Sequence, residues 1–376
     1  MRKSIFVSLL LICVSVCKAQ TATEYYEKGN DLKGEMKIKE ALAAYKEATR
    51  LDPNYSAAWY EMGWCSNDLK DYTGAISYLR KARPMWSSIP KVYFELGYAF
   101  EKTEKLDSAT ANYNRCLELK PDYSLAHKQL GTMAYNKSDY TTALKHYKKY
   151  EEFSKTTITD YLYWYRRGFA NNALKNYEDA KGSLNKSLEI KKDYTNTYLE
   201  LGFAYKNLKQ NDDAISNYKK AIELDPQSHI PYNGIGEVYR DNIKDRREAM
   251  AWYQKALDIN SKERKACFGV GYCLNSLGKY SEAIPYLKTA IEQETTYTAA
   301  YVELGYSYYM TKNNSLALTS LNKALEQNPK NINARYYSGL IYIDQKNKTM
   351  AQQMVDELKE LGSKDATALQ EKVNKM

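Results

Sequence analysis

The sequence contains few of the residues that most often build catalytic and metal-binding sites. Among its 376 residues are only 3 histidines and 6 cysteines. His127, His146 and His229 have no cysteine, histidine or carboxylate neighbour at a spacing typical of a metal site. The sequence also has no GxSxG, HExxH, P-loop or dinucleotide-binding motif. We therefore expect no enzymatic activity, no cofactor and no metal.

The cysteines are too sparse to predict a disulfide framework. Beyond the first twenty residues, the remaining four form no CxxC pair. Two of them, Cys267 and Cys273, lie at positions that fall on different faces of one helix. We expect the four cysteines to be small apolar packing residues.

Clusters of one charge are missing as well. The formal net charge is +9, and subtracting Arg2, Lys3 and Lys18 leaves +6 for the chain after residue 19. The densest basic stretches are pairs such as Lys148-Lys149. A nucleic-acid-binding protein is expected to carry a basic patch, because phosphate neutralisation requires clustered cations. The sequence therefore predicts a solvated surface and no nucleic-acid partner.

A long apolar run occurs only in the first twenty residues, MRKSIFVSLLLICVSVCKAQ. Two basic residues precede the run from Ile5 to Cys17, and a small residue, Ala19, follows it, which is the order of a secretory signal peptide. The run is too short to span a bilayer comfortably. A lipoprotein signal is disfavoured, because Val16 rather than a small residue precedes Cys17. We expect residues 1–19 to be a cleaved signal peptide and the protein to be exported, periplasmic or envelope-associated in a bacterium.

Glycine recurs at fixed intervals along the rest of the chain. Ten of the 17 glycines share one phase, with steps of 34 residues except for one step of 37 and one of 35. They are Gly29, Gly63, Gly97, Gly131, Gly168, Gly202, Gly236, Gly271, Gly305 and Gly339. An alanine follows nine of them after twelve residues, whereas Ala249 follows Gly236 after thirteen. The extra residue of the longer step therefore lies between Gly236 and Ala249.

The residues around each glycine have helical spacing. In the first unit, packing residues recur at i, i+3, i+4 and i+7 around Gly29 and again around Ala41. Because only small residues let two helices approach closely, Gly29 and Ala41 predict a crossing point, with Tyr45 filling the gap beside it. Pro53 then ends the second helix, since proline cannot continue it. Prolines at the same phase of later units are Pro121, Pro226 and Pro329.

A 34-residue unit with these glycine, alanine and proline positions resembles the tetratricopeptide repeat. The resemblance implies an all-α, right-handed superhelical solenoid of helix-turn-helix repeats. Counted from Ala22, ten units fit the chain: 22–55, 56–89, 90–123, 124–157, 161–194, 195–228, 229–263, 264–297, 298–331 and 332–365. We expect repeats 1–4 over residues 22–157, an irregular joint at 158–160, repeats 5–10 over 161–365 and a C-terminal capping helix at 366–376.

The fifth repeat departs from the pattern next to the expected joint. Arg167 and Asn171 stand there at positions where most other repeats carry apolar residues. A buried guanidinium without a partner would be costly. We therefore hypothesise that Glu151, Glu152 or Asp160 supplies a carboxylate to Arg167.

A second stripe on each first helix is aromatic where an ordinary amphipathic helix would be polar. In YVELGYSYYM, residues 301–310, Tyr306 and Tyr309 are turned about 100° from the packing stripe. In the family this flank faces the groove, so the resemblance implies an aromatic-lined concave surface. The candidate partner-binding residues are Tyr26, Tyr60, Trp64, Phe94, Tyr98, Tyr135, Tyr165, Phe169, Phe203, Phe268, Tyr272, Tyr306 and Tyr309. The alternative is that these rings pack against the next repeat and leave little surface exposed.

The resemblance and the aromatic flank together predict a scaffold for protein–protein interaction. We expect it to bind an extended segment of a protein or peptide partner, in envelope assembly or secretion. The family's clamp for an acidic C-terminal carboxylate uses lysine and asparagine, and only Asn30 and Lys91 fit it here. A role as adaptor for such tails is therefore disfavoured. A glycan-binding module is the alternative function, because tyrosine and tryptophan also stack on sugar faces.

Overall fold

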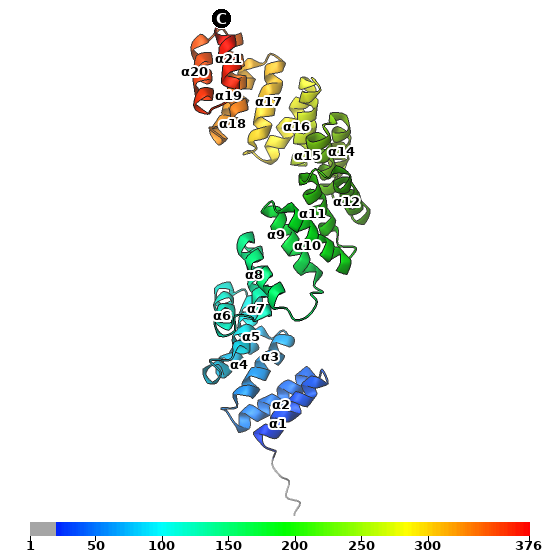
Figure 1. Cartoon of the computed structure of the whole chain (residues 1–376), viewed down its shortest axis with the longest axis vertical. Helices are drawn as coiled ribbons and strands as arrows, with labels where there is room; N and C mark the ends of the chain where they lie inside the picture. Colours follow the sequence, from blue (N-terminus) through cyan, green and yellow to red (C-terminus); the bar gives the residue numbers. More distant parts are fainter. Residues whose placement is uncertain (1–19) are drawn as a thin grey trace, which may run out of the picture. The chain divides into compact units, whose positions relative to one another are not determined.

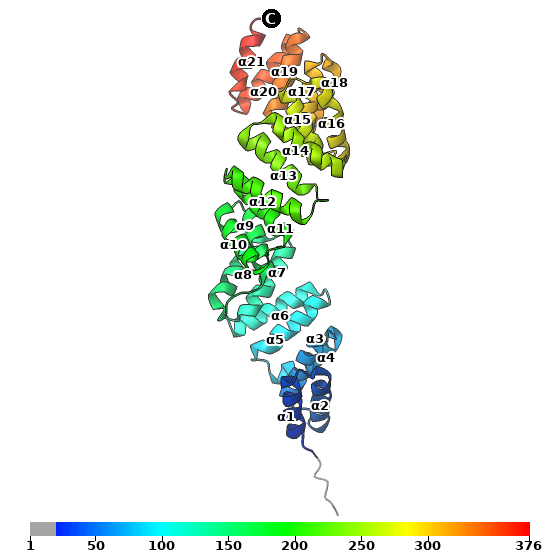
Figure 2. The ribbon, with the colours of Figure 1, turned by 90° about the vertical axis from the view of Figure 1, so that its right-hand side faces the viewer.

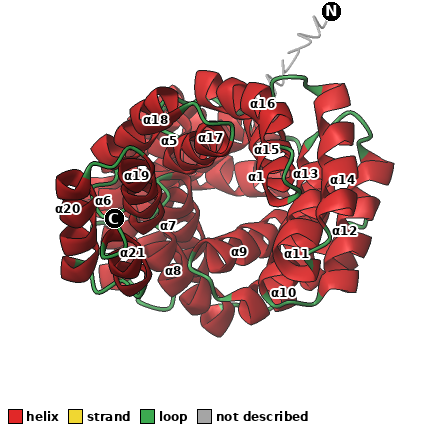
Figure 3. Ribbon diagram, turned by 90° about the horizontal axis from the view of Figure 1, so that it is seen from above, coloured by secondary structure: helices red, strands yellow, loops and turns green. Residues whose placement is uncertain are grey.

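The protein is all helical in residues 20–376, which are the residues that the computed structural model describes. This part of the chain has 21 α-helices, one π-helix and no strand (Figure 3). The predicted all-α fold class is confirmed. The predicted signal peptide, residues 1–19, lies outside the described residues and stays a prediction. The chain divides into two compact units, unit 1 ending at Ile158 and unit 2 beginning at Thr159 (Figure 1).

Unit 1 is a stack of four helical hairpins, and the two helices of each hairpin lie side by side (Figures 1 and 2). Its helices are α1 Ala22–Gly34, α2 Ile38–Leu51, α3 Ser56–Asp68, α4 Tyr72–Met85, α5 Pro90–Lys102, α6 Leu106–Leu119, α7 Ser124–Asn136 and α8 Tyr140–Phe153. Each second helix also packs against the first helix of the next hairpin. One hairpin therefore occupies each 34-residue unit of the sequence.

Unit 2 continues the same pattern over six hairpins and one final helix. Its α-helices are α9 Tyr161–Ala173, α10 Tyr177–Ile190, α11 Thr195–Asn207, α12 Asn211–Leu224, α13 Ile230–Glu237, α14 Arg246–Ile259, α15 Arg264–Ser276, α16 Tyr280–Gln293, α17 Thr298–Met310, α18 Asn314–Gln327, α19 Ile332–Asp344, α20 Lys348–Glu360 and α21 Asp365–Val373. The last helix, α21, packs against α19 and α20 and buries Ala366, Leu369 and Val373. It covers the apolar side of the last hairpin, as a capping helix must.

The phased glycines lie where the two helices of a hairpin cross. A Cβ added to Gly97 would lie 2.7 Å from the Tyr113 ring, and one added to Gly29 would lie 2.5 Å from the Tyr45 ring. Such distances are too short for any side chain, so the ring occupies the space that the glycine leaves. The predicted crossing point of Gly29 and Ala41, with Tyr45 as filler, is confirmed.

The extra residue of the seventh repeat is accommodated by a change of helix type. After α13 the backbone continues as a π-helix, η1, over Val238–Ile243. A π turn holds one residue more than an α turn. The predicted location of the insertion between Gly236 and Ala249 is therefore confirmed. The second helix of the repeat has the usual register, because Ala249 is buried like the phased alanines of the other repeats.

The ends of the helices follow local rules, some of which the sequence made visible. Pro53, Pro121, Pro226 and Pro329 each follow shortly after the end of a second helix, as predicted. The turn between the two helices of every hairpin places one residue in the left-handed region, although only one of these residues is glycine. These residues are Met36, Lys70, Glu104, Ser138, Lys175, Lys209, Lys244, Gly278, Lys312 and Lys346.

The four cysteines are buried and form no disulfide among the described residues, as expected for packing residues. Burial raises the thiol pKa to about 12 for Cys65 and Cys116 and to about 11 for Cys267 and Cys273. These thiols are therefore protonated and unreactive at neutral pH. None of the helices in residues 20–376 has the length and apolar character needed to cross a membrane.

Candidate functional site

Most of the predicted groove residues have rings that reach the surface. Twelve of the thirteen are at least partly exposed, and Phe203 has the largest exposed fraction, 37%. Tyr60 departs from the prediction because it is buried, with an exposed fraction of 7%. Its ring centre lies 5.7 Å from that of Trp86 and 4.0 Å from the Lys91 ammonium, and these two side chains cover it. Tyr60 is therefore a core residue.

Unit 1 has a hollow of about 350 Å³ on the face formed by α3, α5 and α7. Trp64 of α3 lines it together with Phe94 and Tyr98 of α5. The structure thus brings three of the predicted rings to one concavity, which we call the unit 1 hollow. Its polar lining includes Asn67 and Glu95.

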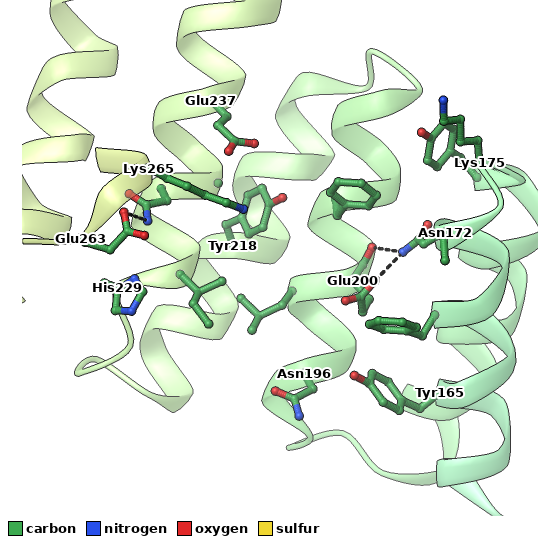
Figure 4. A pocket seen from close by; sticks show the side chains of 18 residues that line it. Tyr165, Asn172, Lys175, Asn196, Glu200, Tyr218, His229, Glu237, Glu263 and Lys265 are labelled. Atoms are coloured by element: carbon green, nitrogen blue, oxygen red, sulfur yellow. Dashed lines mark hydrogen bonds between the residues drawn. The ribbon is translucent and has the colours of Figure 1, made fainter. Parts of the chain in front are cut away.

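Unit 2 has a larger hollow, of about 690 Å³, on the face formed by α9, α11 and α13. Tyr165 and Phe169 of α9 and Phe203 of α11 line this unit 2 hollow, so it also collects three predicted rings. Figure 4 shows Asn172 reaching from α9 to Glu200 of α11. Both hollows therefore combine aromatic rings with an asparagine and a glutamate.

The remaining predicted rings pack against neighbouring residues, which are aromatic for all of them except Tyr309. Tyr306 stacks on Tyr337 with ring centres 4.8 Å apart, and Phe268 lies 5.0 Å from Tyr297. The other members of this set are Tyr26, Tyr135, Tyr272 and Tyr309. None of the six lines either hollow. Packing against neighbours, the alternative raised by the sequence, describes these rings better than an open groove does.

The asparagine and glutamate of the hollows belong to a repeated arrangement, which we call the Asn–Glu pairs. Its members are Asn67–Glu95, Asn172–Glu200 and Asn275–Glu303. In each, the asparagine amide nitrogen donates to the glutamate backbone carbonyl at 2.9–3.1 Å and to its carboxylate Oε2 at 2.7–2.9 Å. Each pair links the first helices of two consecutive repeats, 28 residues apart. The pairs therefore fix the spacing of the helices that form the face with the hollows.

The glutamates of the pairs are shielded from water. Burial raises the pKa of Glu95 to about 7, against the opposing effect of the hydrogen bond from Asn67. Burial also raises the pKa of Glu200 and of Glu303 above the ordinary value. Ionising such a carboxylate costs free energy because the surrounding protein solvates charge less well than water does. A nearby positive charge would offset that cost.

The first two repeats hold an ion pair where later repeats hold an Asn–Glu pair. Lys33 of α1 occupies the asparagine position, and its ammonium nitrogen lies 2.5 Å from Oε2 of Glu61. The same nitrogen lies 4.8 Å from the centre of the Trp64 ring, one helical turn after Glu61. The Glu61 side chain is only 10% exposed, so this ion pair is largely shielded from solvent.

Two of the Asn–Glu pairs leave a buried acceptor without a partner among the described residues. These acceptors are Oδ1 of Asn67 and Oδ1 of Asn172, whose residues are 6% and 4% exposed. In the third pair, the Ser307 hydroxyl donates to Oδ1 of Asn275 at 2.7 Å. A buried acceptor without a hydrogen bond is uncommon and costs free energy.

The glutamates of the pairs have a signal in the sequence. The stretches WYEMGW, YFELGY, YLELGF and YVELGY all place a glutamate two residues before the phased glycine. A glutamate that recurs at the same position among apolar residues indicates that it has the same role in each of these repeats. Apolar packing does not explain a charged residue there. The asparagine partner lies in the preceding repeat and is visible only once the repeats are stacked.

The family can be decided from the repeats themselves. The tetratricopeptide repeat family matches residues 26–88, 90–123, 161–194, 195–228, 231–263 and 274–332, which together are more than half of the chain. The chain belongs to the tetratricopeptide repeat (TPR) family. Such repeats support a role as a protein–protein interaction scaffold.

Known relatives of this TPR chain have larger sequences. Human protein O-mannosyl-transferase TMTC3 is 21% identical over 279 residues, which are 69% of this chain and 30% of that protein. Anaphase-promoting complex subunit 3 of Schizosaccharomyces pombe is 22% identical over 263 residues, which are 70% of this chain and 39% of that protein. This chain therefore spans less than half the length of these two relatives.

Two solved TPR structures have a similar fold. The Cut9–Hcn1 hetero-tetramer of the APC/C matches with a TM-score of 0.52 and 14% identity, covering 94% of this chain and 90% of that chain. PilW, a type IV pilus biogenesis factor, matches with a TM-score of 0.51 and 19% identity, covering 56% of this chain and 97% of that chain. At these identities the likeness shows the fold alone.

The two residues that fit the TPR carboxylate clamp are engaged within the chain. Oδ1 of Asn30 accepts a hydrogen bond from the Tyr45 hydroxyl at 2.8 Å. The Lys91 ammonium lies against the rings of Tyr60 and Trp86. Both side chains stabilise the TPR packing, and neither lines the unit 1 hollow.

Arg167 and Asn171 also make contacts inside unit 2. Nη1 of Arg167 donates to the Ser183 hydroxyl at 2.6 Å, and the Asn171 amide donates to the Arg167 carbonyl at 3.0 Å. Asp160 accepts from the backbone nitrogens of Leu162 and Tyr163 and so caps α9. The hypothesis that a carboxylate reaches Arg167 stays a prediction.

The structure pairs two histidines that the sequence left without partners. Nδ1 of His127 lies 3.1 Å from Nδ1 of His146, and Nε2 of His127 lies 3.0 Å from the Pro121 carbonyl oxygen. Burial, reinforced by the neighbouring His127, lowers the pKa of His146 to about 4. In residues 20–376 no third histidine, cysteine or carboxylate joins such a pair to make a metal-binding group. The pair is therefore a packing contact between α7 and α8.

Proposed function

We propose that this TPR protein binds an extended segment of a partner protein along the face that carries the hollow in each unit. The observation that carries the proposal is the gathering of three aromatic side chains at each hollow, where an ordinary amphipathic helix would be polar. Aromatic side chains are favoured anchors of interfaces.

The first helices also supply the polar groups that orient a bound segment. The unit 2 hollow has a volume of about 690 Å³, which is in the range of pockets that bury a ligand group. Its lining includes Asn172 and Asn233, whose side-chain oxygens can accept from the N–H groups of a peptide backbone. No catalytic group is needed for this role, and we infer a binding protein rather than an enzyme.

We further propose that the protein acts outside the cytoplasm, in assembly or secretion at the envelope if it is bacterial. The support is the sequence of residues 1–19, with basic residues, an apolar run and a small residue at the end. Intact-mass measurement of the exported protein tests this. A mature chain starting at Gln20 is expected. Retention of residues 1–19 would contradict the proposal, and a lipid on Cys17 would contradict cleavage after Ala19.

Glycan binding remains the second candidate, because each hollow places a carboxylate near its rings. Glu95 and Tyr98 line one hollow, and Glu200 and Phe203 line the other. Rings with a nearby carboxylate are also suited to a sugar, whose face stacks and whose hydroxyls donate. Binding of a glycan that competes with the protein partner would favour this second function.

The test begins with affinity capture of the partner by the chain from residue 20 onward, using an envelope extract of the same organism. Trp64→Ala and Tyr98→Ala should then weaken binding to the captured partner by about 2 kcal/mol, the scale of an interface hot spot. Tyr301→Ala is the control, because Tyr301 packs on the core and its loss should lower the melting temperature. Unchanged affinity in both hollow variants would move the binding site to another face.

A further inference from the structure

Lys33, Glu61 and Trp64 form a contact in which a carboxylate and an aromatic ring bind one ammonium group. The Lys33 ammonium touches Oε2 of Glu61 at 2.5 Å and lies 4.8 Å from the Trp64 ring centre. A carboxylate and an aromatic face together bind an ammonium by charge and by cation–π attraction. Glu61 and Trp64 are one turn apart on α3, so a single helix presents both groups.

The same two groups recur at both hollows, but the lysine does not. Glu95 and Tyr98 are one turn apart on α5, and Glu200 and Phe203 are one turn apart on α11. The residue 28 positions before each glutamate is lysine for Glu61, but it is an asparagine for Glu95 and for Glu200. A neutral amide thus replaces the internal ammonium. Neither of these two glutamates forms an ion pair within residues 20–376.

The rings at both hollows are suited to a cation. The Lys102 ammonium lies 5.2 Å from the Tyr98 ring centre, and the Lys206 ammonium lies 5.3 Å from that of Phe203. Lys206 is committed to an ion pair with Glu237. The rings therefore already attract the chain's own lysines on one side. The glutamates beside them have no direct ion-pair partner among the described residues, and the Lys91 ammonium, which packs on Tyr60 and Trp86, acts on Glu95 only from a distance.

The asparagines add acceptors that suit a group with several donors. Oδ1 of Asn67 lies at the unit 1 hollow, and Oδ1 of Asn172 and of Asn233 at the unit 2 hollow, each buried and without a partner among the described residues. The amide hydrogens of Asn67 and Asn172 are already donated to the paired glutamate. Each hollow therefore offers acceptors and an aromatic face where an ammonium or guanidinium would bring several donors.

We propose that each hollow selects a lysine or arginine side chain of the partner segment, held between the glutamate carboxylate, the ring one turn later and the asparagine oxygen. This deepens the proposed function and rests on it. The basic side chain of the partner segment would meet a carboxylate and a ring one turn apart, as Lys33 meets Glu61 and Trp64 within the chain. Ionising the carboxylate costs free energy when it is alone, and becomes favourable when a cation binds beside it. Burial raises the pKa of both glutamates, so each carboxylate is costly to ionise before a cation arrives.

The experiment is a selection of random dodecapeptides displayed on phage against the chain from residue 20 onward. The expected result is enrichment of peptides with lysine or arginine. In the double variant Glu95→Gln and Glu200→Gln, affinity for an enriched peptide should fall about tenfold or more, since breaking a shielded charge pair is strongly unfavourable. Replacing the basic residue of that peptide by glutamine should give the same loss, and the two changes together should not add.

Two controls separate the site from general charge and from misfolding. Glu223→Gln removes an equal charge at an exposed residue that pairs with Lys220, and it should leave peptide affinity unchanged. Ala99→Ser and Ala204→Ser keep both glutamates and place a hydroxyl where Ser307 donates to Asn275. These serines should satisfy Asn67 and Asn172 internally and weaken the preference for basic peptides without loss of helicity by circular dichroism.

The outcomes distinguish this inference from the proposed function. Enriched peptides that contain no basic residue, or a basic preference that survives the glutamine variants, would overturn the cation sites and leave peptide binding intact. Enrichment of no peptide at all would overturn the proposed function and the cation sites together. Loss of affinity in the glutamine variants, together with unchanged affinity in Glu223→Gln, would support both the cation sites and the proposed function.

Discussion

Two regions of unit 2 carry the same aromatic flank but differ in whether it is open. Around α11, Phe203 is 37% exposed. In the next repeat, the residue two positions before the phased glycine is Gly234, which has no side chain to cover the Phe203 ring. Around α17, Tyr306 is covered by Tyr337, which stands at the position equivalent to Gly234, with ring centres 4.8 Å apart. The flank is thus open or closed according to one residue of the following repeat.

The same contrast extends to the polar groups beside the rings. Near α17 the Ser307 hydroxyl satisfies Asn275, whereas near α11 an alanine, Ala204, stands in the serine position and Asn172 keeps a vacant acceptor. Both differences act in one direction, since they complete the contacts around α17 and leave those around α11 incomplete. A region whose contacts are incomplete in the free protein is the better candidate for binding.

The largest effect should come from removing the ring beneath the open region. The Tyr218 side chain fills the space beside two glycines, because a Cβ on Gly202 or Gly234 would lie 2.7 Å or 2.5 Å from its ring. Tyr218→Ala should cost about 3 to 5 kcal/mol, the usual range for a buried aromatic side chain. Hydrogen exchange should show lost protection in α11–α13 and retained protection in α17–α19. Equal loss in both regions would contradict a stack in which each repeat touches only its neighbours.

A smaller loss should follow from adding atoms at the same crossing point. Gly202→Leu places a side chain against Tyr218 and should destabilise the sixth repeat by about 1 to 3 kcal/mol or more, the cost of overpacking. Thermal unfolding measures the loss, and hydrogen exchange locates it. Gly182→Leu is the matched control, since a Cβ there meets nothing within 4 Å. Equal destabilisation by both changes would argue against the close approach at Gly202.

The buried glutamate of unit 1 predicts a dependence of stability on pH. Its pKa of about 7 in the folded protein exceeds the ordinary value of 4.5, so folding stabilises the protonated form. This contribution is complete below pH 4.5 and is lost as the pH rises to 7, with a slope no steeper than about 1.4 kcal/mol per pH unit. The Glu95→Gln variant should lack this slope in urea titrations.

His146, also in unit 1, changes the stability with pH in the opposite direction, so the Glu95→Gln variant is needed to separate the two contributions. The pKa of His146 is lowered from 6.5 to about 4, so its neutral form is favoured on folding and stability rises with pH between these values. Subtracting the Glu95→Gln curve from that of the original protein removes the histidine contribution. A difference that stays constant from pH 4.5 to 7 would contradict the raised pKa of Glu95.

The smallest effect on stability should come from closing the unit 1 hollow with a tyrosine, as Tyr337 covers Tyr306 in unit 2. In unit 1 the position equivalent to Tyr337 is Gln129, which lines the hollow. Gln129→Tyr should cover Tyr98 and change the free energy of unfolding by about 1 kcal/mol or less, because Gln129 is half-buried and its contact with Tyr113 is lost. Binding to unit 1 should nevertheless fall, as measured by titration with the partner. Unchanged affinity would show that the exposure of Tyr98 is irrelevant to binding.

The repeat architecture could be predicted from the sequence because it rests on local spacing. The phased glycines and alanines gave the crossing points, and the step of 35 residues located the insertion that the structure accommodates as η1. These features depend on contacts within one hairpin. They can therefore be read from the sequence by comparing successive stretches of about 34 residues.

The site could be predicted only in part, because exposure depends on the neighbouring repeat. The second stripe identified the rings, but not that Tyr60 lies under Trp86 and Lys91 or that Tyr337 covers Tyr306. The Asn–Glu pairs were missed for the same reason, since asparagine and glutamate are 28 residues apart and meet only across stacked helices. The pairing of His127 with His146 lies within one hairpin and was missed for a different reason, since it depends on how α7 and α8 face each other.

The most direct test of the open hollow as the binding site is photo-crosslinking at its most exposed ring. Replacing Phe203 by p-benzoylphenylalanine keeps an aromatic side chain at a position that is 37% exposed. The same probe at Ser216, an exposed residue of α12 that does not line the hollow, is the control. We expect an adduct with the captured partner from position 203, mapped to a segment with a basic residue, and none from position 216. An adduct from position 216 with none from position 203 would contradict binding at the hollow.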